Sequence, residues 1–133
     1  MKEFVRKNDL GEKVKFFGMV EEKKLHELYQ LSDAFVLYSD WEGFGLVVVE
    51  AMAAGDPAIV SNRGSLPFLV RNGFNGFVVK NDRELREKIR LIMEEDSLRS
   101  KLSENAIRFS KKFSWDEITK KHESKYLEAI KDG

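Results

Sequence analysis

The residues best placed to do chemistry lie between Trp41 and Gly55, in the sequence WEGFGLVVVEAMAAG. Gly43 and Gly45 form a short loop before a helix-like segment whose one charged residue is Glu50. A glycine-rich loop before a helix offers free backbone N–H groups and the positive end of the helix dipole, which bind anions such as phosphate. A carboxylate inside an apolar helix needs partners, because burying it unpaired costs several kcal/mol. The pattern predicts a phosphate at the start of the helix and ligand hydroxyls at Glu50.

The spacing of these residues indicates which part of a single ligand each of them could contact. The backbone of Gly43–Leu46 can approach a diphosphate closely because glycine lacks a side chain. Glu50, one helical turn further, can accept from the two hydroxyls of a ribose. Glu42 precedes the glycines and could face a hydroxylated group beyond the phosphate. In the alternative interpretation, the glycines only build a tight turn and Glu50 bonds neighbouring backbone, and spacing alone leaves both open.

The elements around this loop alternate between strand-like and helix-like patterns. An amphipathic helix is expected over Glu21–Leu31 and an apolar helix over Gly45–Ala54. Strands are expected at four places: Val14–Gly18, Ala34–Tyr38, Pro57–Ser61 and Phe77–Val79. The apolar run Ala34–Tyr38 is typical of a strand buried on both faces. The alternation predicts an α/β fold, a Rossmann-like parallel sheet of about four strands flanked by helices. Ligands of such sheets bind beyond the carboxyl ends of the strands, where the glycine loop would lie.

The second part of the chain is expected to be helical. A short helix is expected over Leu66–Val70, and longer helices over Asp82–Glu94, Ser97–Lys111 and from Ser114 onward. Ser114 and Glu117 form a capping box. We expect a single domain over residues 1–133, with an α/β core over 1–81 and a helical C-terminal part over 82–133. This C-terminal part should pack across the sheet, with Trp115 and Tyr126 as anchors.

Composition excludes several classes of function. The 133 residues suffice for one domain with a core. The net charge is zero without a basic cluster, which argues against a nucleic-acid partner. Cysteine is absent, and His26 and His122 match no zinc spacing, so no metal site is expected. The first residues lack the apolar core of a signal peptide, and the run Phe44–Ala54 is too short to span a bilayer. We therefore expect a cytoplasmic protein without a transmembrane segment.

The chain also resembles a known family over nearly its whole length. It is similar to the C-terminal, donor-binding half of the retaining nucleotide-sugar glycosyltransferases with two Rossmann-like domains (GT-B type, glycosyl transferases group 1, family 4), which include glycogen and sucrose synthases. The matching segments are Val14–Val20, Leu25–Tyr29, Ser32–Leu37, Ser39–Gly55, Pro57–Ser61, Asn72–Val79 and Phe113–Trp115 with Tyr126. The most specific of them, EGFGLVVVEAMAAG, contains two glutamates separated by seven residues.

This resemblance implies a reaction and a role for each motif residue. The reaction is hexosyl transfer from a nucleotide-diphosphate sugar to an acceptor hydroxyl with retained configuration, without a metal or further cofactor. Stabilisation of the departing diphosphate would drive it. The implied roles are catalysis and donor-sugar contact for Glu42, diphosphate binding for the backbone of Gly43, Phe44, Gly45 and Leu46, ribose binding for Glu50, and proximity to the base for Gly18 and Met19.

The chain departs from the family in two respects. Ser65 and Phe68 stand where the family usually has a second glycine and a glutamate. The family's strand–loop–helix–strand with basic phosphate ligands, and its acceptor-binding N-terminal domain, have no counterpart in this sequence. We therefore expect the isolated chain to be inactive and to need that domain, or an upstream polypeptide, as a partner. A non-catalytic nucleotide-sugar-binding or scaffold module is the alternative, and a sugar-nucleotide epimerase of related fold is a third interpretation.

The absent strands also affect the expected sheet. In the order 3-2-1-4-5-6, two strands that this sequence lacks would separate Val14–Gly18 from Ala34–Tyr38. An exposed strand edge invites pairing. We expect either rearranged pairing of these two segments or self-association that fills the gap with a second copy. Roles are also expected for two residues in loops. Trp41 should anchor its loop, and Arg63 should be a solvated arginine that could also reach an anionic ligand.

Overall fold

A three-stranded parallel sheet forms the centre of the protein, for which the computed structural model describes residues 1–131. Its strands are β1 (Phe35–Leu37), β2 (Ala58–Ser61) and β3 (Gly76–Val79), in the order β1-β2-β3. Residue Ile59 of β2 lies between Val36 of β1 and Phe77 of β3. Because the strands are parallel, their carboxyl ends share one edge of the sheet.

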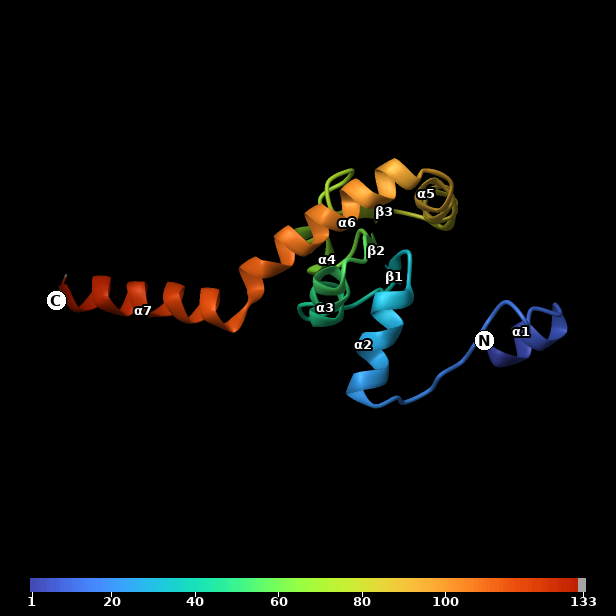
Figure 1. Ribbon diagram of the computed structural model, residues 1–133, viewed down its shortest axis with the longest axis horizontal. Helices are drawn as coiled ribbons and strands as arrows, with labels where there is room; N and C mark the ends of the chain where they lie inside the picture. The colour runs from blue at the N-terminus through green and yellow to red at the C-terminus, as the bar shows by residue number, and fades with distance from the viewer. Residues whose placement is uncertain (132–133) are drawn as a thin grey trace.

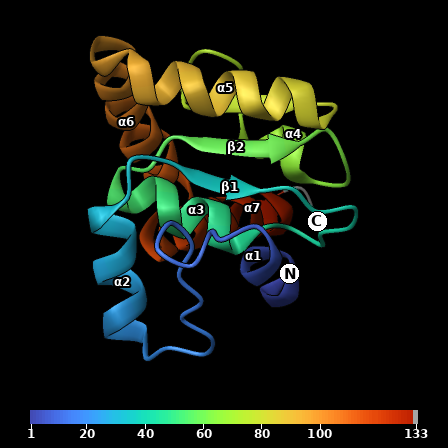
Figure 2. The same ribbon diagram turned by 90° about the vertical axis from the view of Figure 1, so that its right-hand side faces the viewer.

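Helices cover both faces of this sheet. Helix α3 (Leu46–Ala54) joins β1 to β2, α4 (Leu66–Leu69) lies between β2 and β3, and α5 (Asp82–Glu94) follows β3. Figure 2 shows α3 and α5 on opposite sides of β1 and β2. The strand β2 is buried throughout and supplies both faces of the core.

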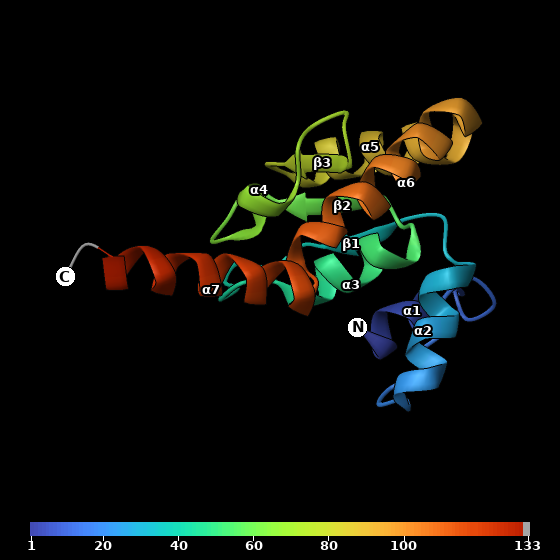
Figure 3. The same ribbon diagram turned by 60° about the vertical axis from the view of Figure 1, so that its left-hand side comes forward.

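Two apolar clusters hold these layers together. The first contains Val60 and packs α3 and α4 against Phe109 of α6 (Asp96–Ser110); the second contains Ile59 and packs β3 against Ile92 of α5 and Leu102 of α6. Helix α6 therefore contributes to both clusters. Figure 3 shows this helix running across the strands. The alternation of Val60 and Ile59 between clusters follows from the two-residue period of a strand.

The segment Val14–Gly18, expected to be a strand, is not one. It runs without regular structure between α1 (Lys2–Lys7) and α2 (Glu22–Leu31), well apart from the sheet (Figure 1). A strand needs a neighbour for its backbone N–H and C=O groups, and no strand among residues 1–131 lies beside this segment. The sheet has three strands instead of about four, and the predicted rearranged pairing with β1 is wrong. Filling of the gap by a second copy stays a prediction.

Strand β1 is also less buried than its apolar sequence predicted. Val36 is 41% exposed. The reason is its position, because β1 is paired on one side only, with β2, within the described chain. A run of apolar residues predicts burial on both faces only when the strand is central in its sheet.

The last helix, α7 (Trp115–Lys131), extends away from the sheet (Figures 1 and 3). It begins after the short 3₁₀ turn η1 (Lys111–Phe113), and the amide of Glu117 donates to Ser114 Oγ at 3.3 Å, which is one half of the predicted capping box. The reciprocal bond is not formed, because the amide of Ser114 donates to the carbonyl oxygen of Lys111. None of residues 115–131 is buried, and Trp115 is 83% exposed. The predicted packing of this helix and its two aromatic anchors is therefore wrong: α6 crosses the sheet in its place. Over residues 1–131, no helix combines the length and apolar character needed to cross a membrane.

Candidate functional site

The loop between β1 and α3 lies at the carboxyl edge of the sheet and ends at Gly45. This residue has φ +87°, and a Cβ added there would lie 2.9 Å from the side chain of Leu66 and 3.3 Å from that of Leu69. Glycine is required on both grounds, conformation and space. The chain therefore turns tightly over α4, and α3 starts at Leu46 with no side-chain cap on its first turn. The N–H of Val48 donates to the carbonyl oxygen of Gly45 at 2.9 Å, so the N–H groups of Leu46 and Val47 are the ones in this turn left for a ligand.

The residues of this loop differ in their exposure to solvent. Glu42 is half-buried, whereas Gly43 and Phe44 are exposed. The Phe44 ring contacts the Phe113 ring edge-on, with centroids 5.8 Å apart. Phe113 of η1 packs in turn on the first apolar cluster. Phe113 belongs to the segment Phe113–Trp115, which the sequence analysis singled out only through the family resemblance. It thus supports the glycine loop, although it lies far from that loop in the sequence.

Glu50 does not lie where its apolar neighbours suggested. Its side chain is exposed, on the face of α3 opposite the buried Val48 and Met52. The expectation that burial forces this carboxylate to find partners is therefore wrong, because an exposed carboxylate keeps its hydration. The same exposure leaves it accessible to a ligand.

Glu50 lies on the boundary between two surface hollows. One, of about 410 Å³, lies between α3 and η1 and is lined by Leu46, Ala53 and Phe113 among others. The second, of about 300 Å³, lies between α3 and α2 and is lined by His26 and Tyr29. The first hollow connects the start of α3 to Glu50, so one ligand can contact both.

Four other residues that the sequence analysis singled out do not line the hollows beside Glu50. Gly18 and Met19 lie in the connection before α2; Met19 is fully exposed, and neither residue lines a hollow that contains Glu50. Trp41 is 84% exposed, so its side chain does not anchor the loop. Arg63 is paired with Asp40 at the carboxyl edge and is not simply solvated.

The phenol of Tyr29 lies close enough to Glu50 and Asp56 for both of their charges to act on it. Its pKa is raised, first by burial and then by the negative charges of Glu50 and Asp56. The ring contacts Phe35 of β1 edge-on at 5.9 Å. Tyr29 therefore carries a neutral hydroxyl between α2 and α3.

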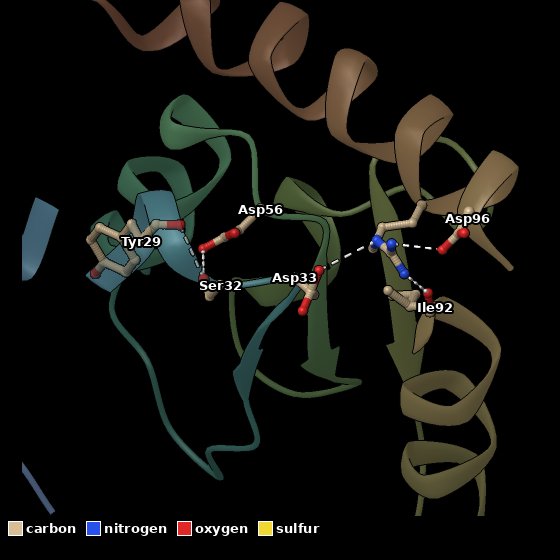
Figure 4. Close-up of polar contacts among 7 residues, drawn as sticks. Tyr29, Ser32, Asp33, Asp56, Ile92 and Asp96 are labelled. Carbon is tan, nitrogen blue, oxygen red and sulfur yellow. Dashed lines mark hydrogen bonds and ion pairs between the residues drawn. The ribbon is translucent and has the colours of Figure 1, made fainter. Parts of the chain in front are cut away.

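Sequence reasoning missed a polar cluster at the opposite, amino edge of the sheet (Figure 4). Asp56 is 2% exposed and its carboxylate accepts from Ser32 Oγ at 2.5 Å. Its pKa is raised to about 6 in total: burial raises it most, the Ser32 hydrogen bond lowers it, and the charge of Asp33 raises it. Arg99 of α6 pairs with Asp33 at 3.5 Å and with Asp96 at 2.7 Å. This cluster joins α2, α6 and the starts of β1 and β2, and its only sequence signal was an aspartate between Gly55 and Pro57.

Comparison with known proteins now identifies the family. The family model described as "Glycosyl transferases group 1" matches residues 1–109. The chain belongs to this family. It is 36% identical over 115 residues to an uncharacterized glycosyltransferase of Methanocaldococcus jannaschii, covering 85% of this chain and 32% of that protein. It is also 36% identical over 97 residues to the D-inositol 3-phosphate glycosyltransferase of Actinosynnema mirum, covering 71% of this chain and 23% of that protein.

Solved glycosyltransferase structures share the fold. Sucrose-phosphate synthase from Thermosynechococcus elongatus superposes with a TM-score of 0.86 and 28% identity, covering 99% of this chain and 34% of that one. Anabaena HepE in complex with UDP-glucose superposes with a TM-score of 0.80 and 26% identity, covering 96% and 35%. The chain thus has the fold of part of a GT-B glycosyltransferase and spans about a third of the length of the proteins it matches.

Proposed function

We propose that this chain is the donor-binding part of an enzyme that transfers a hexosyl group from a nucleotide-diphosphate sugar to an acceptor hydroxyl with retained configuration. The observation that carries the proposal is the accessible Glu50 beside a hollow that leads to the uncapped start of α3. Anabaena HepE, a structural neighbour, was solved with UDP-glucose bound, which favours a donor of this class.

The dimensions of α3 suit a nucleotide diphosphate. Glu50 lies four positions after Leu46, and a helix rises ~1.5 Å per residue, so their levels differ by ~6 Å. A diphosphate on the N–H groups of Gly43–Leu46 would then leave the neighbouring ribose beside Glu50. Under this proposal Glu50 accepts from both ribose hydroxyls, and the base extends toward Gly18 and Met19.

The chemistry assigned to this part of the enzyme is electrostatic. The N–H groups at the start of α3 and the helix dipole stabilise the negative charge that develops on the departing diphosphate. Glu42 contacts the donor sugar. The acceptor and the N-terminal domain, or the polypeptide that supplies it, complete the reaction, and we propose that the isolated chain binds donor without transferring its sugar.

Calorimetric titration of the purified chain with UDP-, GDP- and ADP-glucose tests the proposal. We expect one nucleotide to bind, and Glu50→Ala to weaken that binding about tenfold or more, because each hydrogen bond to a charged group contributes roughly 1.5–3 kcal/mol. Glu104→Ala, an exposed glutamate on α6, is the matched control and should bind as the wild type does. A folded wild-type chain that binds none of the three, or an unchanged affinity of the Glu50 variant, would refute it.

A further inference from the structure

Two loops at the carboxyl edge of the sheet are fastened to one another. They are the β1–α3 loop, residues 38–45, and the β2–α4 connection, residues 62–65, together with Ser61 at the end of β2; Figure 2 shows that the strands before them run in the same direction. Ser61 Oγ donates to the carbonyl oxygen of Ser39 at 2.5 Å, and Ser65 Oγ donates to that of Glu42 at 3.3 Å. Between these two bonds, Arg63 forms an ion pair with Asp40.

The backbones of the loops also touch, at Gly64. This residue has φ +57°, and a Cβ added to it would lie 3.2 Å from the carbonyl oxygen of Glu42 and 3.4 Å from its nitrogen. A larger residue would therefore push against Glu42. Together with Leu66 beneath Gly45, one short segment of chain contacts the glycine loop along its length.

The serine bonds determine which way the N–H groups of the loop point. In a trans peptide the carbonyl oxygen and the following N–H lie on opposite sides. Because the Glu42 oxygen points at Ser65, the N–H of Gly43 points away from the β2–α4 connection. Gly43 itself is exposed, and a Cβ added to it would have no heavy atom within 4 Å, so a ligand can reach this part of the loop. The Ser65 bond thus directs a donor N–H to the side from which a ligand approaches.

The ion pair has an electrostatic consequence for the same site. The side chains of Arg63 and Asp40 are 52% and 83% exposed, so their pairing adds little to the stability of the fold. Without Arg63, however, the negative charge of Asp40 would remain beside a loop that must hold an anion. Arg63 therefore matters more for anion binding than for folding.

We propose that Ser65 and Arg63 are positioning residues of the donor site: Ser65 orients the peptide between Glu42 and Gly43, and Arg63 holds the loop and offsets Asp40. The inference rests on the proposed function for its ligand. Its structural part, the restraint on the loop, does not depend on which anion binds.

The test combines hydrogen exchange of backbone amides with calorimetric titration by UDP. We expect Ser65→Ala and Arg63→Ala each to accelerate exchange at residues 40–46 and to weaken UDP binding, both about two- to fivefold, with little change in melting temperature. Ser65→Thr, which keeps the hydroxyl, should restore both properties. Asp40→Asn should recover part of the affinity lost in Arg63→Ala. Arg83→Ala, which breaks an exposed ion pair with Glu87 on α5, is the control and should change neither.

The outcomes separate the two proposals. A wild-type chain that binds UDP, together with variants that match it in exchange and affinity, overturns the positioning role and leaves the proposed function intact. A folded wild-type chain that binds none of UDP, GDP and ADP contradicts the proposed function; if it binds GDP or ADP in place of UDP, the titrations use that nucleotide. Without nucleotide binding, hydrogen exchange at residues 40–46 still tests whether Ser65 and Arg63 restrain the loop. Faster exchange in both Ser65→Ala and Arg63→Ala supports the restraint, and unchanged exchange rates overturn it.

Discussion

Replacing Asp56 with asparagine is expected to change how the stability of the protein depends on pH. The carboxyl group is almost fully buried, and its pKa rises from 3.8 to about 6 mainly because burial disfavours the charged form. Its folded pKa is thus above its unfolded pKa. Such a group stabilises the fold fully below pH 3.8, and this contribution is lost as the pH rises through about 6.

The size of the effect follows from the two pKa values. At about 1.4 kcal/mol per pH unit, the interval between 3.8 and about 6 corresponds to about 3 kcal/mol. Asparagine keeps an acceptor for Ser32 and does not titrate. The free energy of unfolding of the wild type minus that of Asp56→Asn should therefore fall by about 2.4 kcal/mol between pH 4 and pH 7, somewhat less than the full effect because the unfolded group is already partly ionised at pH 4.

Urea unfolding of both proteins across this pH range measures that difference, and the subtraction removes the other titrating groups. Asp9→Asn, at an exposed position in the N-terminal segment, is the control, and its difference from the wild type should be nearly constant. A constant difference for Asp56→Asn as well would refute the reasoning. It would mean that the carboxyl group has the same proton affinity in the folded and unfolded chain.

Two further predictions concern the glycine loop and the last helix. Gly45→Ala should lower the free energy of unfolding by about 1–3 kcal/mol, since alanine is strained at φ +87° and its Cβ would press on Leu66. Gly43→Ala is the control, because a Cβ at that position meets no heavy atom within 4 Å. Equal melting temperatures of the two variants would contradict the packing described. Trp115→Ala should change the free energy of unfolding by less than about 0.5 kcal/mol, because the side chain is exposed; a clear drop in melting temperature would show that it packs on the domain.

The sequence predicted most elements because their signals are local. The bounds of α5, Asp82–Glu94, were predicted from the helical pattern of this segment. The structure adds an N-cap at Asn81, whose side chain accepts from the amide of Glu84. The strands β2 and β3 differ from prediction by one residue at their starts, since glycine and proline bound them. The turn at Gly45 and the start of α3 also followed from sequence alone.

The failures concern properties that depend on distant neighbours. Val14–Gly18 has the residues of a strand but lacks a partner in the described chain. Glu50 occurs in an apolar helix, yet the sequence did not show which face of that helix is covered. The aromatic ring of Trp115 favours burial without ensuring that a surface lies within reach. Ser65 and Asp56 gained their roles from contacts with residues more than twenty positions away, which no local pattern encodes.

Asp56 and the glycine loop lie at opposite ends of β2, so the loop shares no contact with the buried carboxyl group. Four residues of strand separate the two edges by ~13 Å. A substitution at Asp56 therefore leaves the contacts between the glycine loop and the β2–α4 connection in place. Substitutions at one end of the strand can change the pH dependence of stability, and substitutions at the other can change ligand affinity.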